Sequence, residues 1–227
     1  MISLKNITKR YGEKTVFDNF SLDVEEGAVT AVLGASGSGK TTLLNILAGI
    51  TEYEGEVTGE YLPVSFVFQK DRLVPNLTVK ENLLLVNPSA GDAADSLLSA
   101  AGLADAAGLY PSSLSGGMAR RVAILRAFIY PSRTILLDEP FINLDPALKN
   151  SLIWYFKEMR EKDGRTAILV THDVKEAATL ASRAVIIGNG KVFFDKKGLT
   201  AADENALYAE MIKAAGGGAA PKTAANK

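Results

Sequence analysis

The chain has 227 residues, of which 47% are apolar and 22% are charged, and its formal net charge is −1. These proportions are ordinary for a globular domain with a hydrophobic core, and the small net charge excludes a strong overall attraction to DNA or to an anionic membrane. The lack of cysteine excludes disulfides, zinc–thiolate clusters and thiol chemistry, and it is compatible with the cytoplasm.

The N-terminal third predicts strands around one helix. Residues 2–11 and 15–24 alternate apolar and polar side chains, as half-exposed strands do. The run "AVTAVLG" (28–34) is apolar throughout, which indicates a strand buried on both faces. A glycine-rich stretch leads into the helix pattern "KTTLLNILAG", which Gly49 closes. "GEVTGEYLPVSFVFQ" then predicts two more strands, with Pro63 between them.

The pattern changes between Lys70 and Leu114, which we interpret as a helical insertion. "TVKENLLLV" opens with a capping box of Thr78 and Glu81, and "DAADSLLSAAGL" predicts a second helix. The N-terminus shows no signal peptide, and no apolar run approaches the roughly 18 residues that a membrane-spanning helix needs.

Apolar strands alternate with helices in the last part of the chain. "GGMARRVAILRAFIY" predicts a long helix and "TILLDEP" a buried strand, and Asp145 with Pro146 begins a helix that runs to about Asp163. "TAILVTHD", "VKEAATLAS", "RAVIIGN" and "KVFFD" complete the core. The fold class is therefore α/β, with a mostly parallel sheet flanked by helices, an N-terminal antiparallel β subdomain and a short helical insertion.

We expect one domain over residues 1–215. Its β subdomain and core comprise 1–69 and 115–215, and its helical subdomain comprises about 70–114. The small, polar residues 216–227 predict a flexible tail.

Residues 34–41, "GASGSGKT", match the phosphate-loop pattern G-x-x-x-x-G-K-[ST] in full and lie between a predicted strand and a predicted helix. Backbone N–H groups of such a loop converge on phosphate oxygens, and the helix N-terminus adds positive potential. Lys40 is expected to hold the β- and γ-phosphates, and Thr41 to ligate Mg²⁺. The loop's expected nucleotide-binding residues are Gly34, Ala35, Ser36, Gly37, Ser38, Gly39, Lys40, Thr41 and Thr42.

Two acids, Asp138 and Glu139, follow the apolar strand of "TILLDEP". Asp138 suits a contact to Mg²⁺, and Glu139 suits the polarisation of an attacking water. Two acids after a strand are often only a solvated strand end. Beside a complete phosphate loop, they favour a nucleotide triphosphatase.

The order of the motifs points to a family. The Walker A stretch "GASGSGKTT", the Q-loop "VFQKD" (67–71), the signature "LSGGM", the Walker B stretch "ILLDEP", the D-loop "NLD" and the switch "THD" follow one another along the chain. With these motifs the chain resembles the nucleotide-binding domain of an ATP-binding cassette (ABC) transporter over essentially residues 1–195.

The resemblance implies ATP and Mg²⁺ as cofactors and gives roles to matching residues. Tyr11 stacks on adenine, and the lone histidine, His172, positions the γ-phosphate and the water. Glu139 is the better candidate for the base, and the implied catalytic set is Glu139, His172, Gln69 and Lys40. The implied metal-binding residues are Thr41, Gln69 and Asp138. Plain alternatives stay open: a strand-end tyrosine for Tyr11 and a polar cap for Gln69.

The resemblance also implies a head-to-tail dimer with two ATP molecules in its interface. Ser115, Gly116 and Gly117 contact the γ-phosphate of ATP bound by a second copy, and Asp145 crosses the same interface. Ser115 and Asp145 are also good helix N-caps, so a structural role can coexist. The sequence departs from the family pattern at two positions. The signature ends in Met118 where glutamine is commoner, and the D-loop has Asn143 where a small residue is usual. Both bear on the rate of hydrolysis and on coupling across the dimer interface.

The single cassette, its short insertion and the lack of a basic surplus favour the separate ATPase subunit of a multi-subunit transporter over DNA-repair or translation relatives. "RLVPNLTVKENLLL" and "DEPFINLDPAL" resemble the nitrate, sulfonate and taurine importer branch. The implied partners are permease subunits, contacted through the Q-loop and the insertion, and a substrate-binding protein, with no nucleic acid. The implied location is peripheral, at the cytoplasmic face of the membrane. The alternative is a non-transport ABC ATPase acting mechanically on envelope machinery.

Overall fold

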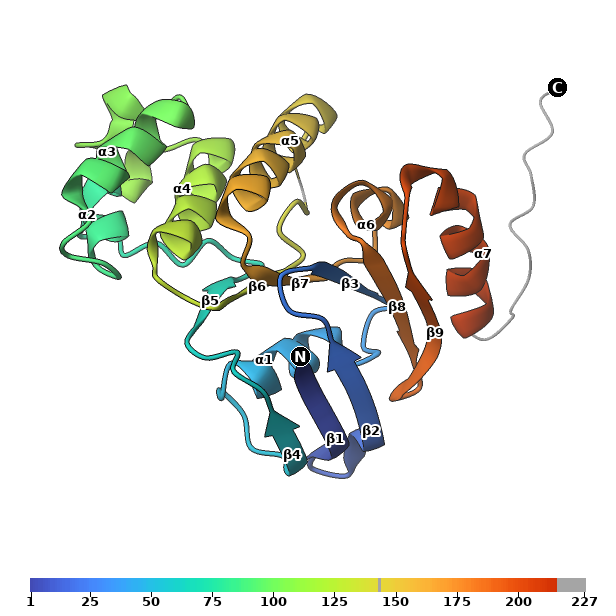
Figure 1. The fold of residues 1–227 in the computed structure, drawn as a ribbon. Coiled ribbons are helices and arrows are strands. Elements are labelled where there is room, and N and C mark those ends of the chain that lie inside the picture. Colours follow the sequence, from blue (N-terminus) through green and yellow to red (C-terminus); the bar gives the residue numbers. More distant parts are fainter. Residues whose placement is uncertain (143, 216–227) are drawn as a thin grey trace, which may run out of the picture.

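The computed structural model describes residues 1–142 and 144–215 (Figure 1). The expectations for Asn143 and for the tail 216–227 lie outside the described residues. Within the described part of the chain, no helix combines the length and the apolar character needed to cross a bilayer.

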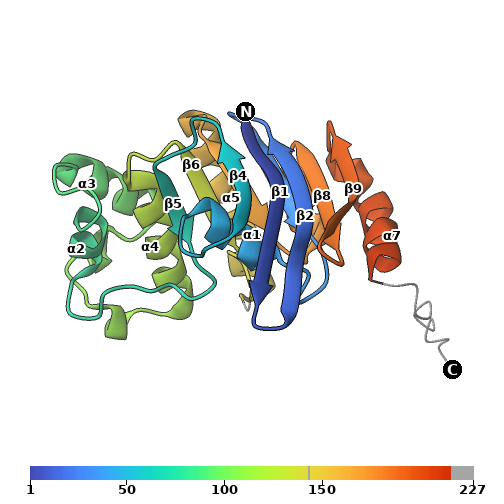
Figure 2. The ribbon, with the colours of Figure 1, turned by 90° about the horizontal axis from the view of Figure 1, so that it is seen from below.

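A small antiparallel sheet is formed by the N-terminal strands, in the order β2-β1-β4. Its strands are β1 (Ile2–Tyr11), β2 (Lys14–Val24) and β4 (Glu54–Thr58). Apolar side chains on one face of β1 and β2, including Ile7 and Phe17, are fully buried against α1 (Lys40–Leu47) and the central sheet. Figure 2 shows this small sheet and α1 lying over one face of the central strands.

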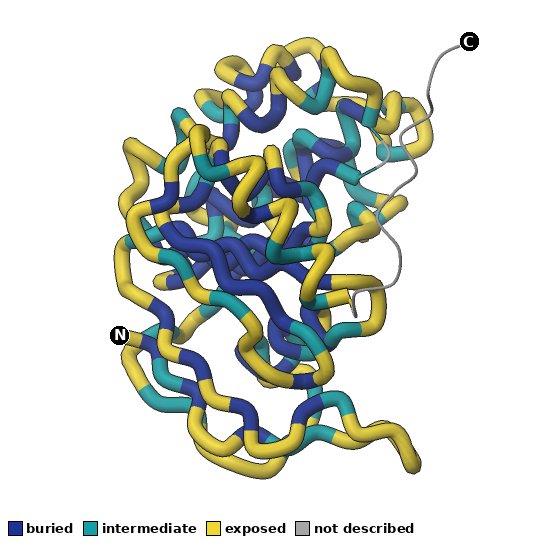
Figure 3. The backbone as a smooth tube through the Cα atoms, turned by 90° about the vertical axis from the view of Figure 1, so that its right-hand side faces the viewer, coloured by how far each residue is buried: buried dark blue, intermediate teal, exposed yellow. Residues whose placement is uncertain are grey.

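The central sheet has six strands in the order β5-β6-β7-β3-β8-β9. The first five are parallel, and β9 pairs antiparallel with β8. The strands are β3 (Val29–Leu33), β5 (Val64–Val67), β6 (Thr134–Asp138), β7 (Thr166–Val170), β8 (Arg183–Gly188) and β9 (Lys191–Lys197). Every residue of β3, β6 and β7 is buried, which explains why their sequences are almost entirely apolar (Figure 3).

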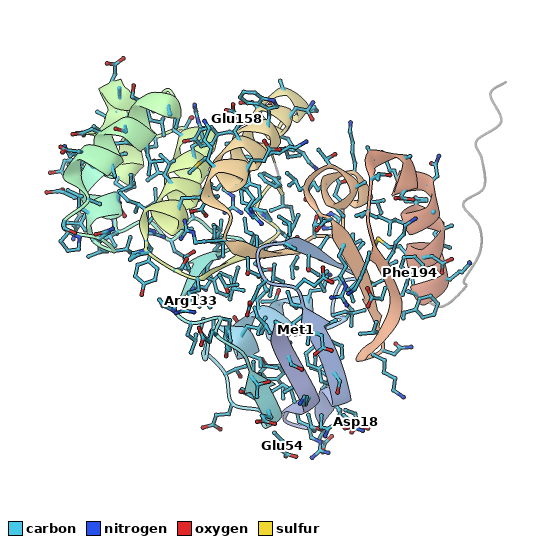
Figure 4. The ribbon with its side chains drawn as sticks, in the orientation of Figure 1. Met1, Asp18, Glu54, Arg133, Glu158 and Phe194 are labelled. Carbon is cyan, nitrogen blue, oxygen red and sulfur yellow. The ribbon has the colours of Figure 1, made fainter. Side chains whose placement is uncertain are left out.

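Helices cover the opposite face of the central sheet (Figure 1). They are α4 (Gly116–Ile129), α5 (Pro146–Asp163), α6 (Val174–Leu180) and, after a short 3₁₀ turn (Ala201–Asp203), α7 (Glu204–Ala214). Side chains fill the space between these helices and the strands (Figure 4). The predicted fold class is confirmed, because a mostly parallel sheet lies between helices and a separate antiparallel sheet.

The insertion forms a small helical layer of its own. It contains α2 (Val79–Leu84), α3 (Gly91–Ala100) and two 3₁₀ turns (Ala104–Ala106 and Pro111–Ser113). The predicted capping box of Thr78 and Glu81 is present at the start of α2.

Helix α4 joins this layer to the core. Its Val122 and Leu125 pack among the buried residues of the insertion. Its Ile124 and Phe128 pack in the core between the central sheet and the helices that cover it. A boundary at residue 114 stays a prediction, since the buried faces of α4 belong to both parts.

Candidate functional site

The phosphate loop (34–41) runs from the end of β3 to the start of α1. Its glycines adopt backbone angles that side chains rarely take, with φ of +152° at Gly34, +79° at Gly37 and +103° at Gly39. A Cβ at Gly34 would collide with the Ile187 carbonyl, and one at Gly39 would lie 2.8 Å from the Phe17 ring. Glycine is therefore required at both positions by conformation and by close packing.

A pocket of about 370 Å³ opens above this loop. It brings together residues that are far apart in the sequence, from the end of β1, the phosphate loop, the Q-loop and the end of β6. The residues that line it are Tyr11, Lys14, Val16, Ser36, Gly37, Gly39, Lys40, Thr41, Thr42, Gln69, Asp138 and Glu139. Ala35 and Ser38 line an adjoining pocket that shares Lys14, Val16, Ser36 and Gly37 with the first.

Lys40 is held inside the loop by backbone oxygens. Its Nζ donates to the carbonyls of Gly34 at 2.8 Å and Ala35 at 3.0 Å, and the residue is only 6% exposed. Burial lowers the pKa of Lys40, while the nearby carboxylates of Glu139 and Asp138 raise it. The ammonium group is thus positioned by the loop itself.

Thr41 and Asp138 meet at the floor of the pocket. The Thr41 hydroxyl donates to the Asp138 carboxylate, with its Oγ1 3.0 Å from Oδ2 and 3.1 Å from Oδ1. Burial raises the pKa of Asp138, and the hydrogen bond from Thr41 and the charges of Lys40 and Arg120 oppose that rise.

These oxygens suit a magnesium ion. Mg²⁺ is usually held by one or two protein oxygens together with phosphate oxygens and water, rather than by a cage of carboxylates. The hydroxyl of Thr41 and the carboxylate of Asp138 are such ligands, and the described residues form no larger cluster of metal-binding side chains. The donor set therefore fits Mg²⁺ bound together with a nucleotide.

Glu139 and His172 lie in contact at the ends of neighbouring strands. Glu139 Oε1 is 3.2 Å from His172 Nδ1, and the Glu139 backbone N–H donates to the Val170 carbonyl at 2.9 Å. Glu139 has a φ of +44°, in the left-handed region that is uncommon for residues other than glycine. The turn after β6 thus aims the carboxylate at the pocket and at the switch histidine.

The switch loop around His172 is anchored by groups that the sequence reasoning missed. Thr171 Oγ1 donates to Glu176 Oε2 at 2.6 Å. Lys149 of α5 pairs with Asp173 at 2.5 Å and with Glu176 at 2.6 Å. Their only sequence signal is the switch motif itself, because Lys149 is distant along the chain.

Tyr11 and Gln69 lie at the rim of the pocket. Tyr11 is 48% exposed, and Lys9 Nζ lies 4.6 Å from the centre of its ring. Gln69 follows β5, and its exposed side chain lines the pocket. Each side chain is therefore free to contact a bound molecule.

The remaining predicted residues lie elsewhere. Ser115, Gly116, Gly117 and Asp145 do not line the pocket. Ser115 caps α4 by accepting the Met118 N–H at 3.3 Å, and Asp145 caps α5 by accepting the Leu148 N–H at 3.0 Å. A Cβ at Gly117 would collide with the Leu148 side chain, whereas one at Gly116 would meet nothing within 4 Å. Packing therefore explains glycine at 117 but not at 116.

Comparisons with a family model and with known proteins agree on one family. A family model described as ABC transporter matches residues 17–142. The aliphatic sulfonates import ATP-binding protein SsuB 2 of Rhodococcus jostii is 39% identical over 203 residues, covering 86% of this chain and 82% of that protein. SsuB of Cupriavidus necator is 38% identical over 209 residues, covering 86% of this chain and 69% of that protein.

Solved structures agree with this result. A bacterial ABC transporter cassette, solved as a dimer, is 33% identical with a TM-score of 0.77, covering 87% of this chain and 98% of that chain. The same cassette, in a dimeric post-hydrolysis state bound to ADP and Pi, is 32% identical with a TM-score of 0.76, at the same coverage. The predicted resemblance is confirmed: the chain belongs to the ABC transporter family and is an ATP-hydrolysing cassette of that family.

Proposed function

We propose that the chain is the ATPase subunit of a multi-subunit importer, placed at the cytoplasmic face of a membrane. The observation that carries this proposal is the convergence of a complete phosphate loop, Asp138 and Glu139 on one pocket. The names of the relatives, which are import ATP-binding proteins, support the importer class.

ATP binds along the pocket from its rim to its floor. Adenine stacks on the exposed ring of Tyr11, and the phosphates lie on the loop at the N-terminus of α1. Lys40 moves its hydrogen bonds from the Gly34 and Ala35 carbonyls to phosphate oxygens. The nucleotide-contacting set is completed by Ser36, Gly37, Ser38, Gly39 and Thr42.

Thr41, Asp138 and Gln69 would hold Mg²⁺, which when bound neutralises charge on the phosphate oxygens. Burial keeps the Asp138 carboxylate out of bulk water, so an approaching cation relieves the electrostatic cost of its charge. Gln69 lines the same pocket and is exposed enough to turn toward the metal and the attacking water.

Hydrolysis uses the contact between Glu139 and His172. The Glu139 carboxylate accepts a proton from water as the water oxygen bonds to the γ-phosphorus and the bond to the bridging oxygen breaks, leaving ADP and phosphate. In this arrangement the Nδ1–H of His172 donates to the Glu139 carboxylate. A neutral ring that turns away from Glu139 and carries its proton on Nε2 donates to a γ-phosphate oxygen. The pair thus positions the base and the phosphate together.

The second half of the site comes from another copy of the chain. Ser115, Gly116 and Gly117 offer a helix N-terminus, which attracts phosphate oxygens. In the described chain this turn does not line the chain's own pocket, and a related cassette has been solved as a dimer. A head-to-tail dimer therefore places each signature on the γ-phosphate held by its partner, with Asp145 beside the same interface.

The helical subdomain, about residues 70–114 of the 1–215 domain, transmits this closure to the membrane. Apolar residues of the Q-loop continuation, such as Leu73 and Val74, are half-buried and so leave part of their surface for a short permease helix. A substrate-binding protein completes the system on the far side of the membrane.

Co-purification after expression with the adjacent genes tests the transport assignment. We expect recovery with a multi-span permease and ATP turnover that depends on Mg²⁺. Turnover together with only soluble envelope or division proteins as partners would contradict the importer assignment and favour a mechanical ATPase. A purified complex without ATP turnover would contradict the catalytic assignment.

A further inference from the structure

We propose that Arg120 is a positioning residue that fixes the backbone of Gln69 and of Glu139 to the signature helix α4. The inference rests on the proposed function, because it concerns how the two halves of the ATP site communicate.

The Arg120 guanidinium is buried among three separate segments, and the residue is 4% exposed. Its Nη1 donates to the Phe68 carbonyl at 2.6 Å and to Asp71 Oδ1 at 2.9 Å, and it lies 3.4 Å from the Gln69 carbonyl. Its Nη2 donates to the Glu139 carbonyl at 3.2 Å, and its Nε donates to the Pro140 carbonyl. One side chain thus ties α4 to the Q-loop and to the turn after β6.

The chemistry of these partners favours positioning over simple charge pairing. Among the described residues, Asp71 is the one carboxylate in contact with Arg120, and the other partners are backbone carbonyls. A planar guanidinium presents its donors in a fixed fork, so it holds several acceptors in one mutual arrangement. A carbonyl direction is set by the backbone angles beside it, so these bonds constrain the angles that aim the side chains of Gln69 and Glu139.

Arg126, on the same helix, fastens the Q-loop at a second point. Its Nη1 and Nη2 donate to the carbonyls of Arg72 and Asp71, each at 3.0 Å. The Arg72 guanidinium in turn lies 3.8 Å from the centre of the Phe68 ring. The Q-loop therefore follows α4 as one unit, and Arg120 extends that unit to the catalytic turn.

The position of Arg120 gives this unit its function. Arg120 lies on the helix that begins at the signature, so a shift of Ser115 and Gly116 onto a partner's nucleotide moves Arg120 as well. The shift then reaches Gln69 and Glu139 through their carbonyls. Neither contact involves the phosphate loop that holds ATP, whereas the chemical step needs both side chains aimed.

The test compares Arg120→Gln with Arg121→Gln. The two substitutions each remove one positive charge, at adjacent positions of α4. Within residues 1–142 and 144–215, Arg121 donates only to the Ala101 carbonyl of the insertion. We expect Arg120→Gln to lower kcat about 10- to 100-fold, since misplacement of about 1 Å costs that much, while the KM for ATP stays within about 3-fold. Arg121→Gln is expected to keep both parameters within about 2-fold of the parent.

Arg120→Lys separates positioning from folding. It keeps the charge beside Asp71 but cannot reach the same set of carbonyls, so we expect a stable protein with an intermediate loss of kcat. If Arg120→Gln or Arg120→Lys kept the parental kcat and only lowered the Tm, the inference about Arg120 would be overturned and the proposed function would stand. A parent chain without ATP turnover would overturn the proposed function and this inference together.

Discussion

The pocket and the signature turn (115–117) differ in how far their own chain completes them. Around the pocket, Lys40 and Asp138 are each only 6% exposed and bond to groups of the same chain. In the signature turn, Ser115 and Gly116 are exposed, and the hydrogen bond of the Ser115 side chain to the described residues is its capping contact. The first region is organised by the core before any ligand arrives, whereas the second is a surface that needs a partner.

The two regions also differ in how much their side chains destabilise the fold when no ligand is bound. The pocket holds a carboxylate and an ammonium group whose charges burial disfavours, as the pKa shifts of Asp138 and Lys40 show. The signature turn contains no ionisable side chain. Substitutions in the pocket should therefore change stability without nucleotide, whereas a substitution of Gly116, whose added Cβ would meet nothing within 4 Å, should change only the assembled enzyme.

The largest effect is expected from Glu139→Gln, which removes the base and keeps the size of the side chain. Turnover should fall about 10²- to 10⁴-fold, while ATP affinity stays near that of the parent. Steady-state ATPase assays and nucleotide titration measure the two quantities. Glu161→Gln, at an exposed position of α5, is the matched control. Parental turnover in Glu139→Gln would refute the assignment of the base.

The next comparison sets Gly116→Ala against Gly117→Ala. A methyl group at 117 meets the end of the Leu148 side chain, which is half-buried and can shift, so this variant should lose up to about 1 kcal/mol of unfolding free energy. A methyl group at 116 meets nothing in its own chain, so the Tm should be unchanged or slightly raised while turnover falls. Thermal unfolding and ATPase assays separate the two cases. Parental turnover in Gly116→Ala would show that no partner nucleotide approaches this backbone.

A smaller effect is expected from Asp138→Asn, measured without nucleotide or metal. Burial raises the folded pKa of Asp138, so its ionisation costs stability, and that cost grows as the pH rises from the unfolded pKa of about 3.9 through the folded one. Near pH 7 the variant should melt a few degrees higher than the parent, and the difference should shrink on acidification. A variant that melts lower than the parent at neutral pH would contradict this account of the pocket.

The smallest effect is expected at the rim, where the ring of Tyr11 is half exposed. Tyr11→Ala should weaken ATP binding by about 1 kcal/mol or slightly more, which is the lower range for stacking of a base on an aromatic ring. Tyr11→Phe keeps the ring and is the control, with affinity within about 2-fold of the parent. Equal affinities for all three proteins in a binding titration would favour the plain strand-end role of Tyr11.

Local patterns predicted most of the fold. The apolar runs of β3, β6 and β7 and the caps at Thr78, Ser115 and Asp145 carry their signals within a few residues, and all are present in the structure. Boundaries were less exact, since β9 extends to Lys197, beyond the predicted Asp195. The roles of the site residues stay predictions, although the structure brings most of the phosphate-side set into one pocket.

Contacts between distant segments could not be predicted in this way. Arg120 reaches Phe68 and Pro140, and Lys149 reaches Asp173, through packing that no short motif encodes. A weak signal existed for Arg120, because helical spacing places it with Gly117 and Ile124 on the buried face of α4. The left-handed φ of Glu139 had no sequence signal, since such angles are rare for residues other than glycine.

Cross-linking tests the shared ATP site most directly, and the chain has no cysteine of its own to interfere. Chains carrying Ser36→Cys are mixed with chains carrying Ser115→Cys, both on a Glu139→Gln background, and treated with a short thiol cross-linker. The two positions are exposed and belong to the two halves of the proposed site. We predict a cross-linked heterodimer that forms with Mg²⁺ and ATP but not without nucleotide. Absence of this product under saturating ATP, while both chains bind nucleotide, would contradict the account.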